Sequence, residues 1–258
     1  MIEGESILVG ATLAAAAALY AWAFVRARRM RRPFPVTALA AFAAGLAALG
    51  AALLGTADDL ADRSLAWHMA QHLVLVSVAA PLLLLGAPLR LALCALPART
   101  ARRLASVLRS TPLRVLTHPA VAWLQFAIVL YGTHFSPLYE AALEHPALHA
   151  FEHMLYLGSG LIFWTPLLAV APAPHAPSHP VRLLALFLAL PMSAFLGFLF
   201  YVAGHVMYPH YATRPAALAD QASAGTVMWV AGGLPLFAAL LICVAAWGAR
   251  ERRLGAIA

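Results

Sequence analysis

The sequence predicts an all-α protein, a bundle of seven transmembrane helices, on two observations. The first is composition: 63% of the 258 residues are hydrophobic and only 10% are charged, whereas soluble domains carry roughly 25% charged residues. The second is that seven apolar stretches each approach the roughly 20 residues that a helix needs to cross a bilayer. We expect residues 1–258 to form one integral membrane domain. The expected helices lie near 4–26, 36–56, 65–86, 119–137, 149–170, 181–205 and 221–247.

The positions of the basic residues predict the orientation of these spans. All 17 are arginines, and they follow the first and last spans, fill the connection between the third and fourth, and precede the sixth. An odd number of spans therefore places all of them on one side, except Arg63 and Arg214. Because cytoplasmic loops are enriched in basic residues, we expect the N-terminus outside and the C-terminus in the cytoplasm. This distribution along a membrane also argues against nucleic-acid binding, which the net charge of +7 alone would suggest.

Four prolines interrupt the predicted spans: Pro81, Pro166, Pro191 and Pro235. Proline has no backbone N–H, and its ring clashes with the carbonyl four residues earlier. We therefore expect each of these helices to kink or unwind locally at its proline.

The predicted orientation also divides the 11 histidines, and most fall at the outer ends of the spans. Among these, "WHMAQH" (67–72) and "HAFEH" (149–153) each hold two histidines four residues apart. Such residues share one helical face, with Cβ atoms about 5–6 Å apart, which is the spacing that helices use to place two imidazoles on one metal ion. Both pairs lie in the first turns of helices that enter from outside, so they share one depth. The sequence therefore predicts a metal site formed by His68, His72, His149 and His153.

Further side chains at this depth extend the candidate set. His134 ends the fourth span there, and we assign it to the metal site. His205 ends the sixth span and is either an additional ligand or an interfacial residue. Glu152 lies between two of the paired histidines and can offset the charge of a cation. Asp220 can do the same, although its position also fits the N-cap of the seventh helix.

The charge at the helix starts favours a soft monovalent cation at this site. Helix N-termini carry a partial positive charge, so the first turns of two helices disfavour a bare divalent cation. Imidazole and thioether ligands suit Cu(I), and Met228 is a candidate thioether ligand. Methionine in a span usually serves packing, and Met69 and Met154 lie about 100° around their helices from the neighbouring histidines, so we do not expect either of them to be a ligand. Imidazole ligands must be neutral, so binding should weaken below about pH 6.5.

Three other functions remain open on these residues. A haem-binding redox protein would need axial histidines on different helices with an apolar slot between them. A copper transporter would need further ligands towards the cytoplasm, whereas polar residues deeper in the spans are few, such as Ser77, Gln125 and Ser193. A scaffold protein would use the histidines only structurally.

Three blocks of the sequence resemble the CtaG family, assembly factors for caa-type cytochrome c oxidase. The first is "WHMAQHLVLVSVAAPLLLLGAPL" (67–89) and the second is "HPAVAWLQFAIVLYGTHFSPLYEAALEHPALHAFEHMLYLGSGLIFWTPLL" (118–168). The third combines "MYPHYA" (207–212) with "LADQASAGTVMWVAGGLP" (218–235). The blocks occur in the family's order and spacing, and they cover most of the chain from 65 to 235.

The resemblance implies a polytopic protein of the bacterial inner membrane that helps to mature the copper centres of a haem–copper oxidase and is not an enzyme. The implied partners are the lipid bilayer and an oxidase subunit or an upstream copper carrier. Together with the histidine pattern, this leads to the hypothesis that the protein binds copper and passes it to the oxidase. The family motif residues are His68, His72, His134, His149, Glu152, His153, Asp220 and Gln221.

Overall fold

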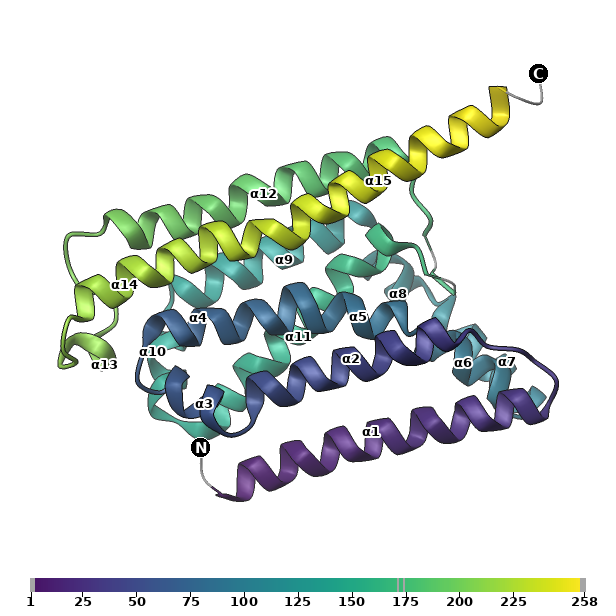
Figure 1. Cartoon of the computed structure of the whole chain (residues 1–258), viewed down its shortest axis with the longest axis horizontal. Coiled ribbons are helices and arrows are strands. Elements are labelled where there is room, and N and C mark those ends of the chain that lie inside the picture. Colours follow the sequence, from purple (N-terminus) through teal and green to yellow (C-terminus); the bar gives the residue numbers. More distant parts are fainter. Residues whose placement is uncertain (1–2, 171, 174, 256–258) are drawn as a thin grey trace.

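The structure, a computed structural model, describes residues 3–170, 172, 173 and 175–255, and over these residues it contains helices and no strands. The expectation of an all-α protein is confirmed. Long helices lie side by side in one bundle, and short helices connect them at both ends (Figure 1).

A long helix lies in each of the seven ranges that the sequence predicts, with different ends, and two of the long helices contain a π-helical segment. The long helices are α1 (Glu3–Arg29), α2 (Val36–Leu53), the run of α4 (Leu65–Leu73), η1 (Val74–Ala79) and α5 (Ala80–Leu85), α9 (Pro119–His134), α11 (Pro146–Leu168), α12 (His179–Val202), and the run of α14 (Ala217–Thr226), η2 (Val227–Ala231) and α15 (Gly232–Gly255). The short helices at one end are α3 (Thr56–Ala61), α10 (Pro137–Glu144) and α13 (Pro209–Ala212). Those towards the other end are α6 (Pro88–Ala95), α7 (Ala98–Leu108) and α8 (Thr111–Leu116).

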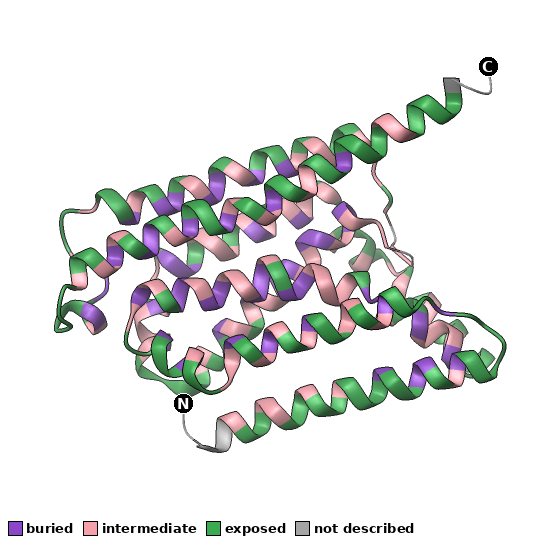
Figure 2. Ribbon diagram, viewed as in Figure 1, coloured by how far each residue is buried: buried purple, intermediate pink, exposed green. Residues whose placement is uncertain are grey.

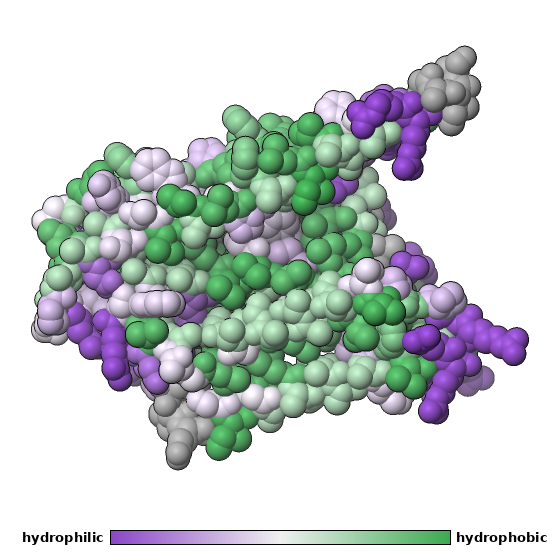
Figure 3. Space-filling view, viewed as in Figure 1, coloured by the Kyte–Doolittle hydropathy of each residue, from purple (hydrophilic) through white to green (hydrophobic). Residues whose placement is uncertain are grey.

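Five helical segments of the described residues are long and apolar enough to cross a membrane. Helix α9 has 16 residues, and α11 carries two histidines and a glutamate in its first turns; neither is among the five. The count of seven spans and their orientation therefore stay predictions. An apolar band crosses the middle of the molecule, and strongly hydrophilic side chains gather at its ends (Figure 3). The five segments are Ser6–Arg29, Val36–Leu53, Leu65–Ala95, His179–Val202 and Ala217–Leu254.

Each π-helical segment contains the residue four positions before a proline, Ser77 before Pro81 and Ala231 before Pro235. Pro81 follows η1, and Pro235 follows η2. Because each proline removes a hydrogen bond and displaces the carbonyl four residues earlier, the helix widens into a π turn at that point. Local unwinding therefore occurs at these two prolines, whereas Pro166 and Pro191 lie inside continuous α-helices.

Side chains of neighbouring helices bind backbone carbonyls at both π segments. The Trp164 indole donates to the Val76 carbonyl over 2.9 Å, and the Ser193 hydroxyl donates to the Met228 carbonyl over 3.1 Å. Irregular backbone inside a membrane protein is stable where its polar groups find such partners. These two bonds hold the widened turns in the interior, where the buried residues of the bundle concentrate (Figure 2).

Helices α12 and α14 cross in close contact at a pair of glycines. A Cβ atom on Gly197 would lie 2.5 Å from the carbonyl oxygen of Gly225, and a Cβ atom on Gly225 would be at least as close to the oxygen of Gly197. Only glycine allows the two backbones to approach to this distance. The crossing places the following π segment, with the buried side chain of Met228, against the core.

Candidate metal centre

Four histidines from two helices meet at one point inside the bundle. His68 and His72 come from α4, and His149 and His153 come from α11. One ring nitrogen of each lies within 4.8 Å of those of the others. Tetrahedral coordination at metal–nitrogen distances of about 2.0–2.1 Å separates ligand nitrogens by roughly 3.4 Å. Small side-chain adjustments would therefore bring all four nitrogens onto one ion, and we call these residues the four-histidine group.

The group is buried on its α4 side. His68 is 0% exposed and His72 is 4% exposed, whereas His149 and His153 are partly exposed. The Nε2 atoms of His68 and His72 lie 3.1 Å apart, and the ring centroids of His149 and His153 lie 4.2 Å apart. Four imidazoles so close together in the interior are typical of a metal site, because the neutral imidazole is a common metal ligand.

The tyrosine of a short end helix orients His68. The Tyr211 hydroxyl of α13 lies 3.1 Å from the Ala61 carbonyl and 3.2 Å from His68 Nδ1. Because a carbonyl can only accept, the hydroxyl donates to Ala61, and Nδ1–H of His68 donates to the hydroxyl oxygen. His68 Nε2 then carries its lone pair into the four-histidine group. Metal-binding histidines are commonly fixed in this way by a hydrogen bond at the second nitrogen.

Glu152 adds a buried carboxylate beside the histidines. Its side chain is 0% exposed, and its Oε2 lies 3.9 Å from His72 Nε2. Neither carboxylate oxygen has a hydrogen-bond partner among the described residues. A buried carboxylate without partners is costly, so a cation held by the histidines would offset its charge.

Tyrosines from the end helices enclose the group. The Tyr139 ring lies 5.4 Å from His68 and is stacked on Tyr208 at 4.2 Å, measured between centroids. Burial raises the pKa values of Tyr139 and Tyr211 above their ordinary range, so both phenols stay neutral at physiological pH. They contribute hydrophobic walls and hydroxyl groups without adding negative charge. Sequence reasoning did not assign a role to Tyr211, although the "MYPHYA" block contains it.

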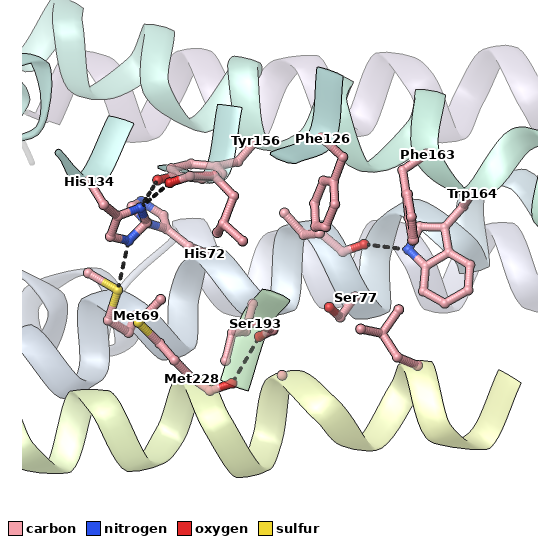
Figure 4. A pocket seen from close by; sticks show the side chains of 15 residues that line it. Met69, His72, Ser77, Phe126, His134, Tyr156, Phe163, Trp164, Ser193 and Met228 are labelled. Atoms are coloured by element: carbon pink, nitrogen blue, oxygen red, sulfur yellow. Dashed lines mark hydrogen bonds between the residues drawn. The ribbon is translucent and has the colours of Figure 1, made fainter. Parts of the chain in front are cut away.

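The structure places His134 outside the four-histidine group. Its Nδ1 lies 2.7 Å from the Leu130 carbonyl, and its Nε2 lies 3.4 Å from the Sδ atom of Met69. Met228 lines the same small cavity as these two residues (Figure 4). The expectation that Met69 serves packing and is not a ligand therefore missed its contact with a histidine.

The polar side chains of α14 hold neighbouring segments in place. The Asp220 carboxylate accepts hydrogen bonds of 2.6 Å from the Ser64 hydroxyl and from the Leu65 N–H. It therefore caps α4, the helix of His68 and His72; the N-cap of α14 is Ala216, so the expected N-cap role of Asp220 on its own helix is wrong.

Gln221 of α14 bonds the connection between α12 and α13, on which His205 lies. The Gln221 side chain accepts from the Met207 N–H over 2.7 Å and donates to the His205 carbonyl over 3.0 Å. It fixes the segment that leads to Tyr208. His205 itself is exposed and is not part of the four-histidine group.

A cavity of about 340 Å³ leads to the partly exposed side of the group. It lies between α1, α2 and α11, and His149 and His153 form part of its wall beside apolar residues such as Leu13, Leu49 and Leu157. The four-histidine group can therefore be approached from the side of α1.

The fold and this site define a class: multi-pass helical membrane proteins with a buried group of four histidines beside a carboxylate. The chain belongs to the family described as cytochrome c oxidase caa3 assembly factor, whose model matches residues 18–250. The resemblance seen in the three sequence blocks is thus confirmed.

Similar proteins occur in mycobacteria. Uncharacterized proteins of Mycobacterium bovis and Mycobacterium tuberculosis are each 29% identical to this chain over 95% of its length, and one of Mycobacterium leprae is 27% identical over the same share. The chain spans 39% of the length of these curated relatives. No solved structure matches the chain significantly.

Proposed function

We propose that the protein binds one Cu(I) ion in the four-histidine group and delivers it to a copper centre of a cytochrome c oxidase during assembly. It acts as a carrier and makes no covalent change to another molecule. The family membership supports the oxidase pathway, and the site supports a metal cargo. The other partners are an upstream copper carrier and the bilayer of the bacterial inner membrane.

The observation that carries this proposal is the combination of four close imidazoles with one buried carboxylate. Four neutral imidazoles and a monovalent cation have one positive charge, and ionised Glu152 balances it. A divalent ion would leave a net positive charge inside the bundle, where charge is costly. Neutral imidazole ligands also suit copper rather than a hard cation such as Ca²⁺ or Mg²⁺.

The position of the site supports a delivery route on the outer side of the membrane. In the proposed topology seven spans place the N-terminus outside, and the arginine-rich end of the bundle faces the cytoplasm. The four-histidine group then lies near the outer surface. His149 and His153 border the cavity between α1 and α11, so ligand exchange with a partner begins at these two residues.

The copper content of the oxidase tests the delivery step. We expect an oxidase purified from cells that carry the His149→Ala/His153→Ala variant to lose most of its copper relative to haem. The matched control is His205→Ala, which changes an exposed histidine outside the group and should leave the ratio unchanged. Normal oxidase copper in the double variant would contradict delivery and favour a scaffold, and a fall in total cell copper instead would favour a transporter.

A further inference from the structure

We propose a second Cu(I) site deeper in the bundle, formed by the Met69 and Met228 thioethers and His134 Nε2. It uses residues outside the four-histidine group and does not depend on that group being occupied. Met69 comes from α4, His134 ends α9, and Met228 lies in the π segment η2. All three side chains are buried, with exposures of 1%, 4% and 3%.

The hydrogen bonds of His134 show that its Nε2 atom presents a lone pair. The Leu130 carbonyl, 2.7 Å from Nδ1, can only accept a hydrogen bond. Nδ1 therefore carries the proton of the neutral ring, and Nε2 is left without one. This nitrogen faces the Sδ atom of Met69 at 3.4 Å, and a thioether sulfur also has only lone pairs to offer. Two acceptors pointing at each other in the interior are the arrangement expected of two ligands of one soft cation.

The surrounding cavity supplies a third ligand and the right environment. A cavity of about 40 Å³ is lined by Met69, His134, Met228 and His72, and Figure 4 shows the Met228 side chain extending towards Met69 and His134. About 10–15 Å³ already holds one water-sized particle. None of the described residues that line it is acidic, so a hard cation such as Ca²⁺ or Mg²⁺ finds no ligands. Thioether and imidazole ligands in an apolar cavity match Cu(I).

The backbone of η2 explains how Met228 reaches this position. The crossing of α12 and α14 at Gly197 and Gly225 brings the last long helix against the core, and π turns frequently occur at functional sites. The Ser193 hydroxyl bonds the Met228 carbonyl and so fixes the residue whose sulfur enters the cavity. His72 belongs to the four-histidine group and also lines this cavity, so the two sites adjoin.

Copper K-edge X-ray absorption of the purified full chain, loaded with Cu(I) under reducing conditions, tests the second site. We expect the unchanged protein to bind two equivalents and to show both nitrogen and sulfur neighbours. The Met69→Leu/Met228→Leu variant should bind one equivalent fewer and lose the sulfur neighbours. Leucine conserves the volume of methionine, and such exchanges usually cost little stability. The control Met154→Leu changes a methionine that is 66% exposed and should behave as the unchanged protein.

The same experiment separates this proposal from that of the four-histidine group. The His68→Ala/His149→Ala variant should keep the sulfur-coordinated equivalent and lose the one bound by nitrogen alone. Absence of sulfur neighbours in the unchanged protein, or their persistence in Met69→Leu/Met228→Leu, would overturn the second site and leave the first intact. Absence of a nitrogen-only equivalent would overturn the first site and leave the second.

Discussion

Changing His68 and His72 to alanine should weaken the nitrogen-coordinated Cu(I) binding of the purified protein at least a hundredfold. The variant removes two of four ligands, and loss of a supporting partner alone typically costs 10–100-fold in metal affinity. These two residues are the most buried members of the group, so water cannot easily replace them. Competition with a Cu(I)-selective chelator gives the affinity.

The control for this prediction is the pair His145→Ala/His205→Ala. Both residues are exposed and lie outside the four-histidine group, so their removal changes the histidine count without touching the site. Affinity should stay within about twofold of the unchanged protein. Equal affinities for the two double variants would show that the i, i+4 pair on α4 does not bind the metal.

Replacing Glu152 with glutamine should lower Cu(I) affinity about tenfold or more while leaving the ligands in place. The carboxylate lies 3.9 Å from His72 Nε2, so an ion bound to that nitrogen would lie near the carboxylate. Opposite unit charges about 4 Å apart attract each other by about 4 kcal/mol at an effective dielectric constant of 20, and less at longer distances. Part of this is offset by rearrangement of the amide. Chelator competition measures the change, and Glu144→Gln, which alters an exposed carboxylate on α10, should have no effect.

The stability of the metal-free protein provides a second readout for Glu152→Gln. Glutamine has nearly the same size as glutamate, and the carboxyl group that it replaces has no hydrogen bond among the described residues, so thermal stability should stay unchanged or rise. Loss of affinity together with unchanged or higher stability is the signature of a charge that serves the ion. A variant that unfolds more readily and binds Cu(I) normally would instead assign Glu152 a structural role.

The i, i+4 spacing made the core of the site predictable. It places His68 with His72, and His149 with His153, on single helical faces, and the matched depth of the two helix starts brings the faces together. The positions of the long helices followed from the length of the apolar stretches in the same way, although most of their ends differ from the predicted ones. The short helices at the bundle ends could not be predicted so easily, because they lack the length and periodicity of a span.

The contacts between helices could not be predicted from spacing within one helix. Met69 lies about 100° around α4 from His68, and for that reason it faces a different neighbour, α9, where His134 ends the helix. The target of Asp220 was missed because its carboxylate reaches the start of α4, far away in the sequence. Tyr211 likewise meets His68 only through the fold. Each of these pairs depends on which helices pack together, and a single sequence carries no direct signal for that.

Anomalous diffraction or cryo-electron microscopy of the protein loaded with Cu(I) tests the central claim most directly. We expect metal density between the ring nitrogens of His68, His72, His149 and His153, next to the Glu152 carboxylate. The central claim would be contradicted if the fully loaded protein showed metal density only at other positions, with the four imidazole rings hydrogen-bonded to each other or to water.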